Sequence, residues 1–226
     1  MMMIKLTINP LMKVIFMKQI ILIILLFCFT TITVSAQKAK TTGELTDKQW
    51  QDLFTALGNE NWDTAFDLST KYLKQLKDDD EAKSIGNLRY MSLYSAAGKV
   101  FEGKMSYDKL DEFVKGFVGK KLVFPYRQIS VKCKGFNFVC PSSEAKNKAM
   151  VTAMNRAGTT ILAFEYLQFK ENFDFAKYDG KEIAVGGIAK SIVPNPNKSN
   201  IVILRIYISD GDAILPEQKE KKASEK

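Results

Sequence analysis

The sequence predicts an α+β protein in which helical hairpins precede a small antiparallel β-barrel. Three observations support this prediction. Apolar residues recur with the period of a helix from residue 46 to about residue 116. Beyond Gly116 the period shifts toward two, and Gly, Pro and Asn separate the apolar stretches. The one long apolar run, near the N-terminus, belongs to neither pattern.

The first half of the chain is predicted to contain four helices. Thr46 and Gln49 have the spacing of a capping box, in which each side chain accepts a hydrogen bond from the other residue's backbone N–H. Asn61 and Ser106 are suited to cap the second and fourth helices, because their side-chain oxygens accept from unpaired N–H groups. The apolar spacing of residues 85–95 indicates the third helix. A single hairpin cannot bury its apolar face, so we expect the hairpins to stack.

The second half is predicted to contain five strands. They span residues 121–133, 136–140, 150–154 with 159–169, 181–192 and 200–209. Residues 170–178 have the length of a short helix or a turn, and the adjacent glycines at 186–187 predict a bulge or bend. Five strands with one short helix fit a small barrel.

These patterns divide the chain into five segments. They are a signal peptide (1–36), a linker (37–45), a helical domain (46–116), a β domain (119–209) and a charged tail (210–226). The tail alternates in charge without an apolar period, which is typical of a disordered chain end.

The apolar run at residues 20–29 is the core of a predicted secretory signal. Lys18 precedes it, and Val34-Ser35-Ala36 supplies the small residues of a cleavage site before Gln37. The run ends after ten residues, whereas a membrane-spanning helix needs about 20. We therefore expect cleavage between Ala36 and Gln37 and export to the periplasm or medium, with no transmembrane segment in the mature chain. A retained N-terminal anchor is the alternative, and Met17 is an alternative start of translation.

The chain contains no histidine, which limits the catalytic and metal-binding mechanisms open to it. This absence excludes Ser-His-Asp and Cys-His nucleophile systems and imidazole metal sites. Paired carboxylates such as Glu165 and Asp174 are the remaining enzymatic alternative. Removal of residues 1–36 leaves 30 basic and 25 acidic residues, so the mature charge is +5 instead of +8, too mild to identify a nucleic-acid partner. We expect a binding or scaffold module without cofactor or metal rather than an enzyme.

The predicted helices carry a repeat-like pattern. The segment Asn61-Trp62-Asp63-Thr64-Ala65 resembles the start of the second helix of a tetratricopeptide repeat, and Trp50 and Leu53 fit the first helix. Phe54 stands where that family has a small residue. The resemblance implies a concave groove for a peptide, and a helical support for the second domain is the alternative.

Residues 177–192, KYDGKEIAVGGIAKSI, resemble the core motif of the OB-fold proteins called tRNA-anti-like. Residues 119–124 are a looser copy of 180–185 and are expected to supply the first strand. The OB fold implies a ligand on the face of strands 2 and 3 and in the loops joining strands 1 to 2 and 4 to 5, where aromatic rings stack on bases or sugars. In this chain the expected ligand contacts in those loops are Lys132, Lys134, Phe136, Asn137, Phe138, Asn195 and Lys198.

Two cysteines, Cys133 and Cys140, remain once Cys28 leaves with the signal. A hairpin between them would place them opposite each other, so both a disulfide and a pair of buried thiols fit. Their spacing lacks the second ligand pair of a zinc site. A protein or another envelope component is the expected partner of the mature chain, with single-stranded nucleic acid or a glycan as the alternative.

Overall fold

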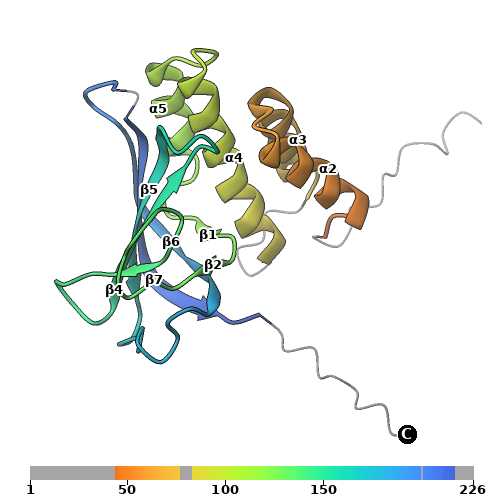
Figure 1. Ribbon diagram of the computed structural model, residues 1–226. Coiled ribbons are helices and arrows are strands. Elements are labelled where there is room, and N and C mark those ends of the chain that lie inside the picture. Colours follow the sequence, from red (N-terminus) through yellow and green to blue (C-terminus); the bar gives the residue numbers. More distant parts are fainter. Residues whose placement is uncertain (1–43, 77–82, 200, 217–226) are drawn as a thin grey trace, which may run out of the picture. The chain divides into compact units, whose positions relative to one another are not determined.

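The computed structural model describes residues 44–76, 83–199 and 201–216 (Figure 1). The predicted signal peptide, the predicted cleavage site between Ala36 and Gln37, the predicted linker up to residue 43 and the end of the predicted tail lie outside these residues. In the described ranges, none of the helices has both the length and the apolar character needed to cross a membrane.

Four helices come first in the described part of the chain. They are α2 (Asp47–Gly58), α3 (Trp62–Gln75), α4 (Lys83–Phe101) and α5 (Tyr107–Lys115) (Figure 1). The capping box is confirmed, because the Thr46 hydroxyl accepts from the Gln49 N–H while the Gln49 side chain accepts from the Thr46 N–H. Asn61 and Ser106 cap α3 and α5 in the predicted way. The predicted starts of these three helices are therefore confirmed.

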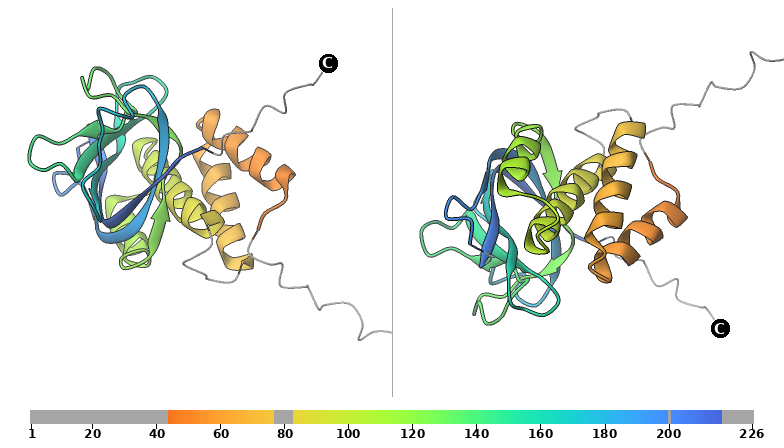
Figure 2. Two further views of the ribbon diagram at one scale, coloured as in Figure 1. Left: turned by 90° about the horizontal axis from the view of Figure 1, so that it is seen from below. Right: turned by 90° about the horizontal axis from the view of Figure 1, so that it is seen from above.

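Helix α4 is buried on nearly all of its sides. It lies between α3 and the sheet, where it contacts β1, β5 and β7 (Figure 2). Two glycines allow this close packing: a Cβ on Gly98 would overlap the indole of Trp62, and one on Gly86 would overlap the side chain of Val123. Helices and strands consequently share one hydrophobic core. The division into two domains at residues 116–119 stays a prediction.

The Gly98→Ala substitution is expected to lower the free energy of unfolding by about 1–3 kcal/mol, because the new methyl group must displace the Trp62 ring. The helical preference for alanine over glycine, about 1 kcal/mol, offsets part of the loss. Urea unfolding measures the difference. Gly58→Ala is the matched control, since no atom lies within 4 Å of a Cβ at that position. A destabilisation by Gly58→Ala equal to that of Gly98→Ala would contradict the steric explanation.

In the described residues, seven strands form one mixed sheet of order β1-β6-β7-β5-β4-β3, with β2 paired to β6. The strands are β1 (Lys121–Val123), β2 (Arg127–Gln128), β3 (Cys140–Pro141), β4 (Lys148–Met154), β5 (Ile161–Phe169), β6 (Glu182–Pro194) and β7 (Val202–Ile214). Every pair is antiparallel except β5 with β7, which is parallel. The α+β class is confirmed.

The expectation of a closed antiparallel barrel needs correction. The sheet is mixed because β7 folds back antiparallel onto β6 and then lies beside β5 in the same direction. It is not closed, because β2 and β3 are two residues long and only one bridge, between Ile129 and Val139, links the segments around them. Pro125 has no N–H to donate and lies in the break between β1 and β2, where one continuous strand was expected.

The loop before β3 also shortens the second predicted strand. Cys133, Gly135 and Asn137 all have positive φ, which ends regular strand geometry. Strand β7 continues to Ile214, because Ala213 and Ile214 pair with β6. The strand therefore extends five residues into the segment that was expected to be a tail.

The connection between β5 and β6 is a turn, one of the two structures expected there. Its aromatic rings pack together: Phe173 stacks on Phe169 and on Tyr178, with centroids 5.1 and 5.2 Å apart. The predicted irregularity at the two glycines is confirmed, because the register of β6 against β7 shifts between Gly186 and Ile188.

Candidate functional site

A groove of about 620 Å³ lies on the outward face of the sheet. Strand β5 alternates, so that Ala163, Glu165 and Leu167 are buried while Tyr166 is partly exposed. Glu165 bonds to a tyrosine of α4, so Tyr166 next to it points away from the helices. We call this feature the sheet groove; its walls and floor include Ser142, Glu144, Lys148, Met150, Tyr166, Gln168, Lys190, Ser191 and Tyr207.

The floor of the sheet groove is one cross-strand row. Strand register places Met150 of β4 beside Tyr166 of β5, Tyr166 beside Tyr207 of β7, and Tyr207 beside Ser191 of β6. The two tyrosine rings are parallel, with centroids 4.5 Å apart and an interplanar angle of 2°. Phe164 extends the aromatic surface, with its centroid 4.7 Å from that of Tyr166. Paired strands therefore hold the aromatic surface in place.

The polar groups around this floor are mixed in charge. Burial, followed by the neighbouring Tyr207, raises the pKa of the Tyr166 hydroxyl, so the group stays protonated at neutral pH and can donate a hydrogen bond. The ammonium group of Lys148 pairs with Glu144 at 3.2 Å. Among the described residues Lys190 has no ion-pair partner, and it stands where the register of β6 against β7 shifts. The rim thus offers hydroxyl donors, one neutralised cation and one available cation.

A buried polar cluster lies on the other side of the sheet, under α4. The Tyr90 hydroxyl donates to Glu165 Oε1 at 2.7 Å, and Arg127 Nη2 donates to the Tyr90 oxygen at 2.6 Å. Arg127 Nη1 is paired with Glu165 Oε2. Burial raises the pKa of the Glu165 carboxyl and the pKa of the Tyr90 hydroxyl, and the Arg127 charge opposes both shifts. We call these three residues the inner cluster; it ties α4 to β2 and β5.

The two carboxylates considered for catalysis are not joined by any contact among the described residues. Glu165 has no exposed surface and is occupied by the inner cluster. Asp174 is exposed in the β5–β6 turn, where its carboxylate accepts from the Lys177 N–H at 3.1 Å. In the described parts of the chain, no three Cys, Asp or Glu side chains gather into a metal site.

The first expected ligand loop precedes β3. Lys132, Lys134 and Phe136 are exposed, and Phe136 keeps 55% of its surface accessible. Asn137 is held in the fold, since its Oδ1 accepts from the N–H of Met154 at 3.1 Å. Phe138 is half-buried.

The second expected ligand loop joins β6 to β7. The buried Asn195 amide donates to the carbonyl of Val202 at 2.8 Å and to the Ser199 hydroxyl at 2.9 Å. Lys198 pairs with Asp108 of α5 at 3.1 Å. Asn195 therefore organises the loop and Lys198 ties it to the helices. No hydrogen bond or ion pair among the described residues joins the two loops.

The Asn195→Ala substitution is expected to cost about 1–3 kcal/mol of unfolding free energy, because it leaves partly buried carbonyl and hydroxyl groups without their donor. Thermal unfolding and hydrogen exchange of the β6–β7 loop measure the effect. Asn197→Ala is the control, since the Asn197 side chain is exposed. Equal stability of the Asn195→Ala variant and the unmodified protein would rule out this structural role.

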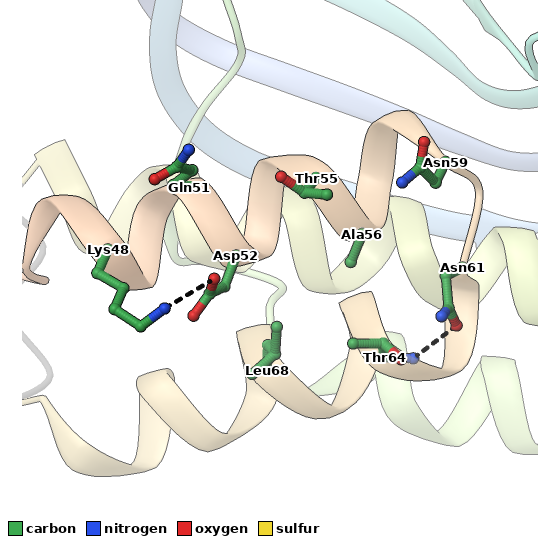
Figure 3. Close-up of a pocket in the computed structure, with 9 residues that line it drawn as sticks. All are labelled: Lys48, Gln51, Asp52, Thr55, Ala56, Asn59, Asn61, Thr64 and Leu68. Carbon is green, nitrogen blue, oxygen red and sulfur yellow. Dashed lines mark hydrogen bonds and ion pairs between the residues drawn. The ribbon is translucent and has the colours of Figure 1, made fainter.

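A second groove of about 630 Å³ lies between α2 and α3 (Figure 3). Gln51 and Thr55 of α2 and Asn59, its C-cap, follow at intervals of four residues and line one side. Among its lining residues Lys48 and Asp52 form an ion pair at 3.6 Å, which lies within α2 and is exposed. We call it the helical groove. Its polar groups face solvent, and its lining includes no aromatic residue.

Of the cysteines in the described residues, Cys140 lies in the edge strand β3 and Cys133 lies in the loop before it. Cys133 is exposed and Cys140 is half-buried, and both are free thiols. Burial of Cys140, followed by its interaction with Cys133, raises the pKa of the Cys140 thiol to about 12.

Sequence reasoning missed the residues of the sheet groove floor. Tyr166 and Tyr207 each occupy an outward position in a strand that alternates between buried and partly exposed residues. That alternation was the available signal. Comparisons with protein-family models, with curated proteins and with solved structures find no match to this chain, so the functional argument rests on its own geometry.

Proposed function

We propose that this protein is a non-enzymatic binding module of the cell envelope and that its sheet groove holds an extended segment of a partner protein. The observation that carries the proposal is the cross-strand row Met150–Tyr166–Tyr207–Ser191. Binding sites combine a mainly apolar floor with a few placed polar groups, and this groove has both.

The rigidity of the floor favours binding. Tyr166 and Tyr207 lie on long paired strands whose other face is packed in the core. The inner cluster anchors β5 to α4 from below. A floor that is ordered before binding loses less conformational freedom when a partner arrives.

The chemistry of the rim favours a polypeptide. Tyrosine and serine hydroxyls and the Gln168 amide can pair with backbone N–H and C=O groups of an extended segment. Tyrosine is also among the residues enriched at protein interfaces. Glu144 neutralises Lys148, so a chain of phosphates would meet a carboxylate at this rim. A neutral peptide avoids that repulsion.

The arrangement of the strands supports an OB-like interpretation of the β domain. Taken together, β1 and β2 pair with β6, and a bridge links their end to the residue before β3. Counting residues 121–128 as one strand gives the spatial order of a Greek key. The OB fold is a partly open Greek-key barrel that binds ligands on strands 2 and 3, the places that β4 and β5 would take. The tetratricopeptide-like interpretation of α2 and α3 is kept as part of this proposal.

Site-specific photo-crosslinking tests the proposal. A photoreactive amino acid is placed at Ser191 in the sheet groove or at Thr55 in the helical groove, and the full chain is irradiated in its native envelope. We expect one defined adduct from Ser191, reduced by Tyr166→Ala, and none from Thr55. An adduct from Thr55 alone would move the function to the helices. Absence of adducts from both positions would reject a protein partner.

The envelope location depends on the predicted signal. The intact mass of the protein recovered from the native envelope is expected to match a chain that begins at Gln37. A mass that retains residues 17–36 would replace export as a soluble protein with membrane anchoring or retention in the cell.

A single-stranded nucleic acid or an oligosaccharide is the second candidate. Lys190 beside the tyrosine pair and Arg205 in register with Phe164 favour it, because cations next to aromatic rings bind backbone phosphates and stacked rings. Fluorescence anisotropy with an oligothymidine and with a neutral oligosaccharide separates the two ligands. Nucleic-acid binding must weaken steeply with added salt. Salt-independent binding of the sugar would select the glycan, and no binding of either would leave the protein partner.

A further inference from the structure

The loop at residues 130–139 folds back on itself, and two of its non-glycine residues adopt unfavourable backbone conformations. Cys133 has φ 48° and Asn137 has φ 63°, in the left-handed region that L-residues rarely adopt. Both ends are anchored: the Val131 N–H donates to Asp179 Oδ1 at 3.0 Å, and the Asn137 N–H donates to the Thr152 carbonyl at 3.0 Å. Unusual backbone conformations of this kind persist where the surrounding contacts enforce them.

This folding brings two thiols together. The Cys133 S–H donates to the Ser130 carbonyl at 3.3 Å, and the Ser130 N–H donates to the carbonyl of Val139, the residue before Cys140, at 3.1 Å. Cys140 lies opposite Met150 in the β3–β4 register, and Met150 begins the floor row of the sheet groove. The thiol pair therefore lies at one end of that row.

We infer that Cys133 and Cys140 form a reversible disulfide that locks the loop at residues 130–139 against the edge of the sheet groove. The neighbouring positions of the two cysteines, which the hydrogen bonds of Ser130 to Cys133 and to Val139 define, carry this inference, with one thiol exposed and one half-buried. The inference does not depend on what the sheet groove binds.

The oxidation proceeds by thiol–disulfide exchange with an external disulfide. The exposed Cys133, as its thiolate, attacks one sulfur of that disulfide, forms a mixed disulfide and releases the first external thiolate. Cys140 then gives up its proton to solvent and attacks Cys133 Sγ, which releases the second external thiolate. Two protons and two electrons leave the protein, and the external disulfide becomes two thiols. The high pKa of Cys140 fits its place as the second sulfur to react.

Lys132 and Lys134 provide a direct readout of the locked loop. Both are exposed and flank Cys133, so trypsin can cut on either side of it when the loop opens. A bridge restrains that opening. We expect oxidation to slow cleavage at these two lysines by about tenfold, because proteolysis follows the population of the open segment.

The test uses the full chain, purified after export and divided into samples treated with cystamine or with dithiothreitol. Intact mass after alkylation counts the free thiols. Peptide mapping then assigns each alkylated thiol to its cysteine, so that Cys28 is not counted with Cys133 and Cys140. Timed trypsin digestion follows cleavage at Lys132 and Lys134. We expect the oxidised sample to lose both alkylation sites as a monomer and to resist trypsin. Cys133→Ser and Cys140→Ser are the matched controls and are expected to cut at one rate in both samples.

Three results would overturn the inference. They are full alkylation of Cys133 and Cys140 after cystamine, disulfide-linked dimers in place of the internal bridge, and equal cleavage rates in oxidised and reduced protein. Each is read without any ligand, so loss of the inferred disulfide and loss of the proposed binding function are distinguishable.

Discussion

Replacing Glu165 with leucine is expected to lower the free energy of unfolding by about 3–5 kcal/mol, because it leaves the Arg127 guanidinium buried without its counter-ion. Arg127 and Glu165 expose 9% and 0% of their side chains, so water cannot replace the lost partner. The Tyr90 hydroxyl also loses its acceptor. Urea unfolding followed by circular dichroism measures the change.

A double-mutant cycle separates the contribution of the ion pair to stability from the contribution of side-chain volume. The variant that combines Glu165→Leu with Arg127→Met is expected to recover part of the lost stability, since apolar side chains of similar size pack together in place of the buried ion pair. The Tyr90 hydroxyl stays without its partners in this variant. Tyr90→Phe is expected to cost less, about 1–3 kcal/mol, because it removes a hydroxyl and keeps the ion pair. A loss below about 1 kcal/mol for Glu165→Leu alone would contradict the view that the pair is desolvated.

The Tyr207→Ala substitution is expected to weaken partner binding by about 30-fold or more, equal to roughly 2 kcal/mol, the size of an interface hot spot. It removes one ring of the stacked pair and opens the middle of the groove floor. Folding stability is expected to change less, because the tyrosine is partly exposed. The partner that crosslinking identifies is purified on its own, and binding titrations with it measure the effect.

Two variants control for this prediction. Tyr207→Phe keeps the ring and is expected to keep most of the affinity. Phe54→Ala removes an aromatic ring of α2 that is 52% exposed, and it is expected to leave binding unchanged. Loss of binding in Phe54→Ala with normal binding in Tyr207→Ala would place the interface on the helices.

The starts of the helices could be predicted because they depend on neighbouring residues. Thr46 with Gln49, Asn61 and Ser106 satisfy backbone N–H groups within four residues of themselves. The irregularity at residues 186–187 was equally local, since two glycines in succession weaken a strand. The break at Pro125 had a local signal as well, but the strand expected there ran through it.

The candidate site depends on contacts that no local pattern contains. Asn195 and Lys198 were expected to meet a ligand because the OB-fold resemblance put them in a ligand loop, and in the fold they bond to Val202 and to Asp108. Glu165 looked like one carboxylate among many until the fold placed it against Tyr90 and Arg127. A polar side chain in a sequence does not reveal whether its partner is solvent, a ligand or another residue.

By itself, the sequence determined the order of helices and strands, the helix caps and the alternation that turns Tyr166 and Tyr207 away from the core. Hydrogen bonds within one turn and the period of each strand decide these features. Only the tertiary structure decided that β7 would lie parallel to β5 and bring the two tyrosine rings face to face. Register between strands separated by the whole of β6 is set by packing of the complete core, and the groove exists only once that core has formed.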